Sequence, residues 1–196
     1  MGDEANNHYN LYKEDVALMK SLGHNAYRFS VCWSRIMPEG RGEINEKGIQ
    51  FYSNLVDELL AAGIEPFLTI YHWDLPQALQ DIGGWQNEDM IGYFEDYCKV
   101  LFERLGGRVK KWITLNEPYC TAIAGNLTAE HAPGIRDLGT ALRVSYILLR
   151  AHGAAVRLFR AMKVPGEIGI TLNAMPTYPV GDSSEDALAA SRQDGL

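Results

Sequence analysis

Hydrophobic and polar positions alternate in blocks along the chain, and the blocks predict two kinds of element. Short runs rich in β-branched and aromatic residues are typical of buried strands. Between these runs the period is helical: apolar residues recur at i, i+3, i+4, i+7 and i+8 from residue 52 to residue 60, and with a similar spacing over 90–105. The strand-like runs occupy residues 26–31, 66–71, 109–115 and 167–172. Strands and helices are therefore predicted to alternate.

Residues typical of helix ends agree with this alternation. A further helix is predicted over 11–22, ahead of the first strand, and a last one over 184–192. The expected N-caps are Asn45, Asn87 and Thr140, and the glycines expected after last turns are Gly23, Gly63 and Gly106. Strands that alternate with helices imply a parallel sheet covered by helices.

The ends of the strands favour a barrel over a doubly wound sheet. Neither GxGxxG nor GxxxxGK[ST] occurs, so the phosphate-binding turns of nucleotide-binding sheets are missing. Each strand is instead followed by large polar or aromatic residues, as a barrel requires at the end where its active site lies. We predict an α/β fold, a partial (β/α)8 barrel of about four βα units, with residues 1–196 forming a single incomplete domain. A complete barrel typically needs about 250 residues.

Composition and charge exclude several classes of function. The net charge of -7 repels a phosphate backbone, so nucleic acid is not an expected partner. No apolar run reaches the roughly 18 residues of a membrane span, and the first ten residues do not resemble a signal peptide. The three cysteines have neither disulfide-framework nor zinc-ligand spacing. We expect no metal and no membrane association, and a cytoplasmic location.

Three residues after the predicted strands have side chains suited to sugar chemistry. Glu117 stands between an amide and a proline that fixes the turn, and partial burial favours the protonated acid that a general acid uses. Taken alone, such a Glu more often caps or solvates a loop. His72 and Trp73 combine a donor, an acceptor and a flat apolar face, although each residue is also common in plain cores. Together they indicate a neutral polyhydroxylated ligand such as a sugar.

Arg28 interrupts an apolar strand. A charge inside such a strand is costly without a partner, so we expect the guanidinium to point inward and to meet a buried carboxylate. That carboxylate would be a candidate for a second catalytic acid.

Five motifs in the same order resemble glycoside hydrolase family 1, the β-glucosidase family. They are AYRFSVCWSRIMPEG (26–40), LTIYHWDLPQAL (68–79), WITLNEP (112–118), HAPG (131–134) and GITLN (169–173). The resemblance extends over essentially the whole chain. It implies that the four predicted strands are strands 2 to 5 of the family's barrel.

The resemblance also implies roles for individual residues. Glu117 matches the family's acid/base, and His72, Trp73 and Asn116 match residues that bind hydroxyls of the sugar in the cleaved subsite. Two further matches support the site. They are Arg28, whose counterpart contacts the nucleophile, and Asn173, whose counterpart lies behind the substrate-binding residues. No metal or organic cofactor is implied.

One expected feature is absent from the sequence. The family's nucleophile lies in an ITENG-type motif on a later strand, and no such motif occurs in the 196 residues. Glu65 precedes its strand, on the wrong face, and Asp74 matches a family residue with no nucleophilic role, so neither replaces it. Asn126 opens an N-glycosylation sequon that we interpret as a chance match.

Two functional hypotheses follow. The first is the N-terminal portion of a retaining β-glucosidase that acts on a β-glucoside or oligosaccharide. The second is a catalytically inert half-barrel that binds sugar weakly or associates with itself through its open sheet edges. An aldolase-type barrel is disfavoured, because Lys110 and Lys111 stand at the start of their strand and not at its end. The sequence does not choose among glucosides, galactosides and fucosides.

Overall fold

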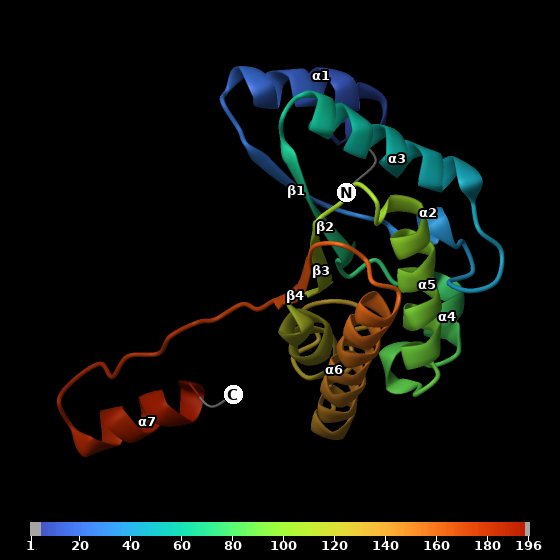
Figure 1. The fold of residues 1–196 in the computed structure, drawn as a ribbon. Coiled ribbons are helices and arrows are strands. Elements are labelled where there is room, and N and C mark those ends of the chain that lie inside the picture. Colours follow the sequence, from blue (N-terminus) through green and yellow to red (C-terminus); the bar gives the residue numbers. More distant parts are fainter. Residues whose placement is uncertain (1–4, 195–196) are drawn as a thin grey trace.

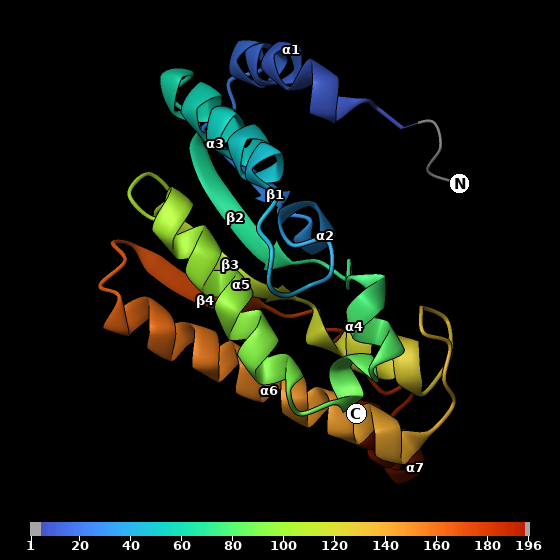
Figure 2. The same cartoon turned by 90° about the vertical axis from the view of Figure 1, so that its right-hand side faces the viewer.

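The computed structural model describes residues 5–194, and its centre is a parallel four-stranded sheet. The strands are β1 (Ala26–Ser30), β2 (Glu65–Tyr71), β3 (Lys111–Asn116) and β4 (Glu167–Thr171), in the order β1-β2-β3-β4. Because each strand pairs with the next and crossovers between parallel strands are right-handed, the long helices that connect them lie on one face of the sheet (Figures 1 and 2). The arrangement confirms the predicted α/β fold and its four βα units.

Helices precede, connect and follow the strands. The long ones are α1 (His8–Ser21), α3 (Glu46–Ala61), α5 (Met90–Leu105), α6 (Leu138–Ala161) and α7 (Ser184–Asp194). The short ones are α2 (Trp33–Ile36), α4 (Gln77–Asp81), the 3-10 turn η1 (Gly84–Gln86) and the π-helical turn η2 (Cys120–Ala124). Every short element follows a strand, which places extra structure at the carboxyl edge of the sheet.

Helix starts were predicted correctly in one case of three. Asn45 caps α3, and its side chain accepts a hydrogen bond from the backbone N–H of residue 47. Thr140 does not cap α6. The N-cap is Asp137, whose Oδ2 accepts a hydrogen bond from Thr140 N at 2.6 Å. Asn87 is not a cap either. The helix α5 begins at Met90 with Asp89 as its N-cap, and Asn87 Oδ1 accepts a hydrogen bond from Asp89 N at 3.0 Å.

An aromatic cluster beneath the carboxyl edge supports the loops after β1 and β2. The indole of Trp33 is fully buried and stacks on the Tyr97 ring with centroids 4.8 Å apart. The Tyr97 hydroxyl lies 3.2 Å from Val31 O and 3.1 Å from Ile70 O, so one side chain of α5 contacts the ends of two strands. The cluster fixes where the loops that carry the candidate site begin.

The two outer strands are less buried than the sequence predicts. β2 is buried along most of its length, whereas Ala26 and Arg28 of β1 and Glu167 and Gly169 of β4 are exposed. The prediction that all four strands are buried was therefore wrong for β1 and β4. Both strands lie at a sheet edge, and the described helices cover only one face.

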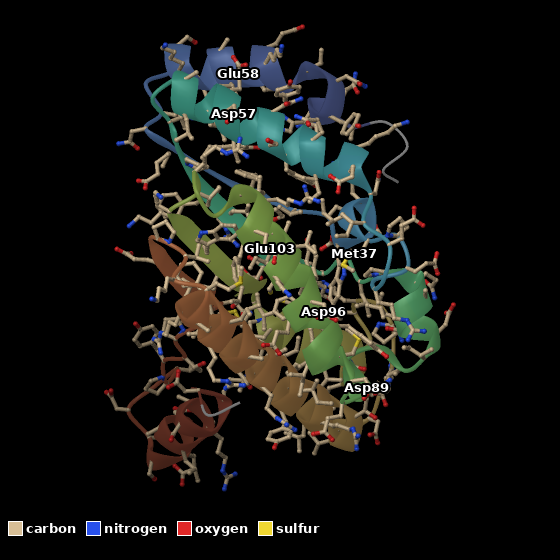
Figure 3. All side chains as sticks on the ribbon, turned by 45° about the vertical axis from the view of Figure 1, so that its right-hand side comes forward. Met37, Asp57, Glu58, Asp89, Asp96 and Glu103 are labelled. Carbon is tan, nitrogen blue, oxygen red and sulfur yellow. The ribbon has the colours of Figure 1, made fainter. Side chains whose placement is uncertain are left out.

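Surface features agree with the charge of the chain. Acidic side chains labelled in Figure 3 (Asp57 on α3, Asp96 and Glu103 on α5) are exposed on the helical layer.

Beyond β4 the chain leaves the body of the molecule (Figure 1), and the Val180 side chain is 99% exposed there. Within residues 5–194, no helix has the length and hydropathy needed to cross a membrane.

We expect the open sheet edges to promote association between copies of the chain. Within residues 5–194, β1 and β4 each present one row of backbone groups without a neighbouring strand, and such edges pair readily. Sedimentation velocity should show a sedimentation coefficient that rises with concentration. The variant Gly169→Lys, which places a charge on β4 at an exposed position where a side chain meets open space, should shift the equilibrium toward monomer. A monomer at every concentration would contradict the expectation.

Candidate active site

All six candidate residues belong to the sheet or to the segments that leave its carboxyl edge. They are Arg28 on β1, His72 and Trp73 after β2, Asn116 and Glu117 at the end of β3, and Asn173 after β4. Parallel strands bring these positions to one side of the sheet. Hydrogen bonds between them define the geometry of the site.

Asn116 links β3 to β1. Its Oδ1 accepts a hydrogen bond from Arg28 Nη2, and Arg28 Nε donates to Thr69 Oγ1 at 3.0 Å. Asn116 is 2% exposed, and Arg28 is exposed. The expectation of a buried arginine with a carboxylate partner was therefore wrong within residues 5–194, where no ion pair involves Arg28. The guanidinium keeps contact with solvent because this face of the sheet is open, so neutral oxygen acceptors suffice.

His72 is oriented from two directions. Its Nδ1 lies 2.8 Å from Ser30 Oγ, and its backbone N–H donates to Asp74 Oδ1 at 3.2 Å. Burial, followed by the positive charge of Arg28, lowers the pKa of His72 below its usual value. The imidazole is therefore neutral at neutral pH, so one ring nitrogen donates and the other accepts. A neutral imidazole suits the hydroxyls of a sugar.

Asp74 joins the loops after β1 and β2. Its Oδ2 accepts from Trp33 N at 2.6 Å, and its other oxygen accepts from His72 N. Burial raises the pKa of Asp74 in spite of these hydrogen bonds. Both oxygens are engaged by the backbone, which supports a positioning role and not a nucleophilic one. Glu65 begins β2, at the opposite edge of the sheet.

Two candidate residues have left-handed backbone conformations. Trp73 has φ 75° and Glu117 has φ 46°. Non-glycine residues adopt such angles at a cost of about 1–3 kcal/mol, and Asn7, Ala129 and Lys163 do so elsewhere in the chain. Neighbouring contacts hold both residues: Trp73 Nε1 donates to Asn116 O at 2.9 Å, and Glu117 N donates to Thr171 O at 2.9 Å. Strain at both positions is consistent with a functional site.

Cys120 contacts the Glu117 carboxylate, a contact that the sequence reasoning missed. Its Sγ donates to Glu117 Oε2 at 3.4 Å, and Asn173 Nδ2 lies 3.9 Å from the same sulfur. Burial and the adjacent carboxylate raise the pKa of the Cys120 thiol to about 11. The signal was available, since Cys120 follows Glu117 by three residues and a helical turn begins there.

The Cys120 contact predicts slow thiol chemistry. Alkylation requires the thiolate, and a pKa of about 11 instead of 9 lowers the thiolate fraction near pH 8 about 100-fold. We expect iodoacetamide to modify Cys120 slowly and Glu117→Gln to accelerate the reaction, as followed by peptide mass spectrometry. Glu65→Gln is the matched control and should leave the rate unchanged. Equal rates in all three proteins would contradict the contact.

Among residues 5–194, no three His, Cys, Asp or Glu side chains gather closely enough to hold a metal ion. The six candidate residues supply one carboxylic acid, a neutral imidazole, two amides, an indole and a guanidinium. A family model described as glycosyl hydrolase family 1 matches residues 1–195. The chain belongs to this family.

Relatives within the family include several β-glucosidases. Beta-glucosidase A of Thermotoga maritima is 52% identical over 96% of this chain, and beta-glucosidase A of Acetivibrio thermocellus is 50% identical over 96%. A 6-phospho-beta-glucosidase of Bacillus subtilis is 45% identical over 96%. The chain spans 42%, 42% and 40% of the length of these relatives.

A solved structure matches in three dimensions as well. The Thermotoga maritima β-glucosidase in complex with glucoimidazole superposes with a TM-score of 0.95 at 51% identity, over 97% of this chain and 43% of that one. The family and the partial barrel predicted from the motifs are therefore confirmed.

Proposed function

We propose that this chain supplies the acid/base side of a retaining β-glucosidase active site, with Glu117 as the acid/base. In the retaining mechanism one carboxyl group protonates the leaving oxygen while a second, about 5 Å away, attacks the anomeric carbon. Glu117 then acts as a carboxylate and activates the water that releases the sugar. The observation that carries the proposal is the strained Glu117, held next to Asn116 at the carboxyl end of β3.

The neighbours of Glu117 provide the contacts that a sugar requires. His72 offers the ring nitrogen that Ser30 does not contact, Trp73, which is 39% exposed, offers its indole, and Asn116 offers an amide fixed by Arg28. Asn173 contacts the thiol that touches Glu117. We propose that His72, Trp73 and Asn116 bind the glycone. Arg28 positions Asn116, and Asn173 supports Glu117 through the Cys120 thiol. The Thermotoga maritima β-glucosidase has been solved in complex with deoxynojirimycin, a sugar-like ligand, which supports a β-glucoside as substrate.

The second carboxylate is proposed to come from the part of the barrel that the relatives have and this chain does not match. The chain spans 42% of a β-glucosidase of the family, and its own sequence contains no ITENG-type motif. Arg28 has two neutral hydrogen-bond partners and is exposed beside them, so its guanidinium is available to an incoming carboxylate. An inert half-barrel is the second candidate, favoured by the open edges of β1 and β4.

We propose a cytoplasmic location, on the basis of the cysteine thiols alone. All three cysteines are free, and Cys32 and Cys120 are partly exposed. Free, partly exposed thiols are typical of a reducing compartment such as the cytoplasm.

Hydrolysis of an aryl β-glucoside tests the proposal. We define the fusion as residues 1–196 joined to the remainder of the Thermotoga maritima beta-glucosidase A. The fusion should release the aryl group, and Glu117→Gln should remove most of this activity. The isolated chain should show little or none. Activity of the isolated chain at the rate of the fusion would contradict the need for a second carboxylate, and an inactive but folded fusion would favour the inert half-barrel.

A further inference from the structure

The outward face of α6 carries a row of large apolar side chains. The helix lies beside α5 in the helical layer (Figure 2), and its buried residues face α5 and the sheet. The row lies on the opposite side of the helix, at spacings of three and four residues, and consists of Leu138, Leu142, Tyr146 and Leu149. Each of the four is between 55% and 61% exposed. Together they expose on the order of 400 Å², and a contiguous apolar patch of that size marks an interaction surface.

An open groove continues the row toward the C-terminal end of α6. Its volume is about 360 Å³, and it is lined by Ile91 of α5 and by Tyr146, Leu149, Arg150, Gly153 and Arg157 of α6. Gly153 has no side chain, and a Cβ at this position would have Arg157 Nη1 as its neighbour, at 3.4 Å. The groove therefore leaves room above Gly153 for an aliphatic side chain from another molecule.

The row and the groove lie on one helix, so two copies of the chain can fill each other's grooves. Consider two α6 helices that pack antiparallel, with a two-fold axis close to Tyr146. Leu142 of one copy then faces Gly153 of the second copy, and Leu138 faces Arg157 of the second copy. A two-fold contact of this kind is self-complementary. It places a leucine ridge in a glycine groove, which is how helices pack.

Charges near the two ends of α6 fit the same antiparallel arrangement. Asp137 is the exposed N-cap of the helix, and Arg157 is exposed near its C-terminal end. Within the described part of the chain no carboxylate pairs with Arg157. Antiparallel packing brings Asp137 of each copy to Arg157 of the other. Arg150, which lies closer to the axis, is already paired with Glu88 and adds no unbalanced charge.

We propose that the outward face of α6 is a homodimer interface, in which Leu142 of each copy occupies the groove above Gly153 of the other. The two faces together bury on the order of 800 Å², less than the roughly 1,600 Å² of a standard interface. The dimer is therefore weak, with a dissociation constant between about 10 μM and 1 mM. The interface lies on the side of α6 that faces away from the sheet, so it depends neither on Glu117 nor on the open edges of β1 and β4.

Sedimentation velocity of the chain tests the interface, with Gly169→Lys present to reduce pairing through the sheet edge. A monomer–dimer equilibrium is expected in the stated range. Leu142→Glu should raise the dissociation constant at least tenfold. Leu18→Glu is the matched control, because Leu18 on α1 is also 58% exposed, and it should change the constant less than twofold.

A second variant separates the groove from general surface hydrophobicity. Gly153→Leu adds an apolar side chain that fills the groove from within its own chain, so it should weaken the dimer at least tenfold. The helix itself should form more readily, since leucine has a higher helix propensity than glycine. Association that becomes stronger in Gly153→Leu would overturn the proposal.

The charge pair tests the antiparallel arrangement. Arg157→Asp should weaken the dimer about two- to fivefold, because it would place two carboxylates together. Asp137→Asn, added to Arg157→Asp, removes this repulsion and keeps a residue that caps helices well. The double variant should therefore dimerise more tightly than Arg157→Asp alone. No recovery would overturn the antiparallel pairing.

Two further results would overturn the proposal. The first is a chain that stays monomeric up to about 1 mM, or one in which Leu142→Glu and Leu18→Glu have equal effects. The second concerns a different occupant, because arginines beside an apolar row also suit an anionic lipid surface. A monomeric chain that binds phosphatidylglycerol vesicles, and loses this binding in Leu142→Glu, would assign the face to a membrane instead of a second copy.

Discussion

Glu117→Gln in the fusion is expected to lower kcat/KM for an alkyl β-glucoside by about 10²–10⁴-fold, the usual contribution of a general acid. An alkoxide is a poor leaving group and depends on protonation in the transition state. The amide of Gln keeps the size of the side chain and its left-handed position after β3, but it carries no transferable proton. The loss is therefore one of chemistry and not of folding.

The size of the loss should depend on the leaving group. The dinitrophenolate of a dinitrophenyl β-glucoside leaves without protonation. The first step should therefore be nearly unaffected in the variant, and the slow step should become the release of the sugar. Glu65→Gln is the matched control, since this acid begins β2 at the opposite edge, and it should change kcat/KM less than twofold. An equal loss for alkyl and dinitrophenyl substrates would contradict the assignment of Glu117 as the acid.

Trp33→Ala is expected to lower the free energy of unfolding by about 3–5 kcal/mol, as truncation of a large buried aromatic side chain does. The indole is fully buried, stacks on Tyr97 and donates to Gly40 O at 3.1 Å. Alanine would remove these contacts and leave a cavity beneath the loops after β1 and β2. Urea unfolding followed by circular dichroism measures the change.

The control for this variant is an exposed aromatic residue. Tyr146 on α6 is 61% exposed, and Tyr146→Ala should change the free energy of unfolding by less than about 0.5 kcal/mol. If Trp33→Ala were no more destabilising than Tyr146→Ala, the aromatic cluster would not be the support of the carboxyl edge.

The order of the elements could be predicted because local patterns determine it. β2 and β3 are apolar runs with little ambiguity, and α3 and α5 show clear helical periods. The position of Glu117 at a strand end also followed from the run before it. Helix starts were harder, because Asp137 and Thr140 are both acceptable caps and the choice depends on where the preceding loop leaves the chain.

The environment of the site could not be predicted, because it depends on contacts between distant segments. The left-handed φ of Trp73 leaves no mark in the sequence. Arg28 was expected to need a carboxylate because burial was assumed on both faces of β1, whereas the structure leaves one face open and offers Thr69 and Asn116 as acceptors.

The product that azide forms with Glu117→Gln in the fusion tests the central claim most directly. If Glu117 is the acid/base, a dinitrophenyl β-glucoside still forms the covalent sugar–enzyme intermediate, and azide then attacks it from the β face without needing a base. The account predicts faster turnover with azide and a β-glucosyl azide, identified by the coupling constant of the anomeric proton. An α-glucosyl azide would mean that Glu117 is the nucleophile, and it would contradict the account.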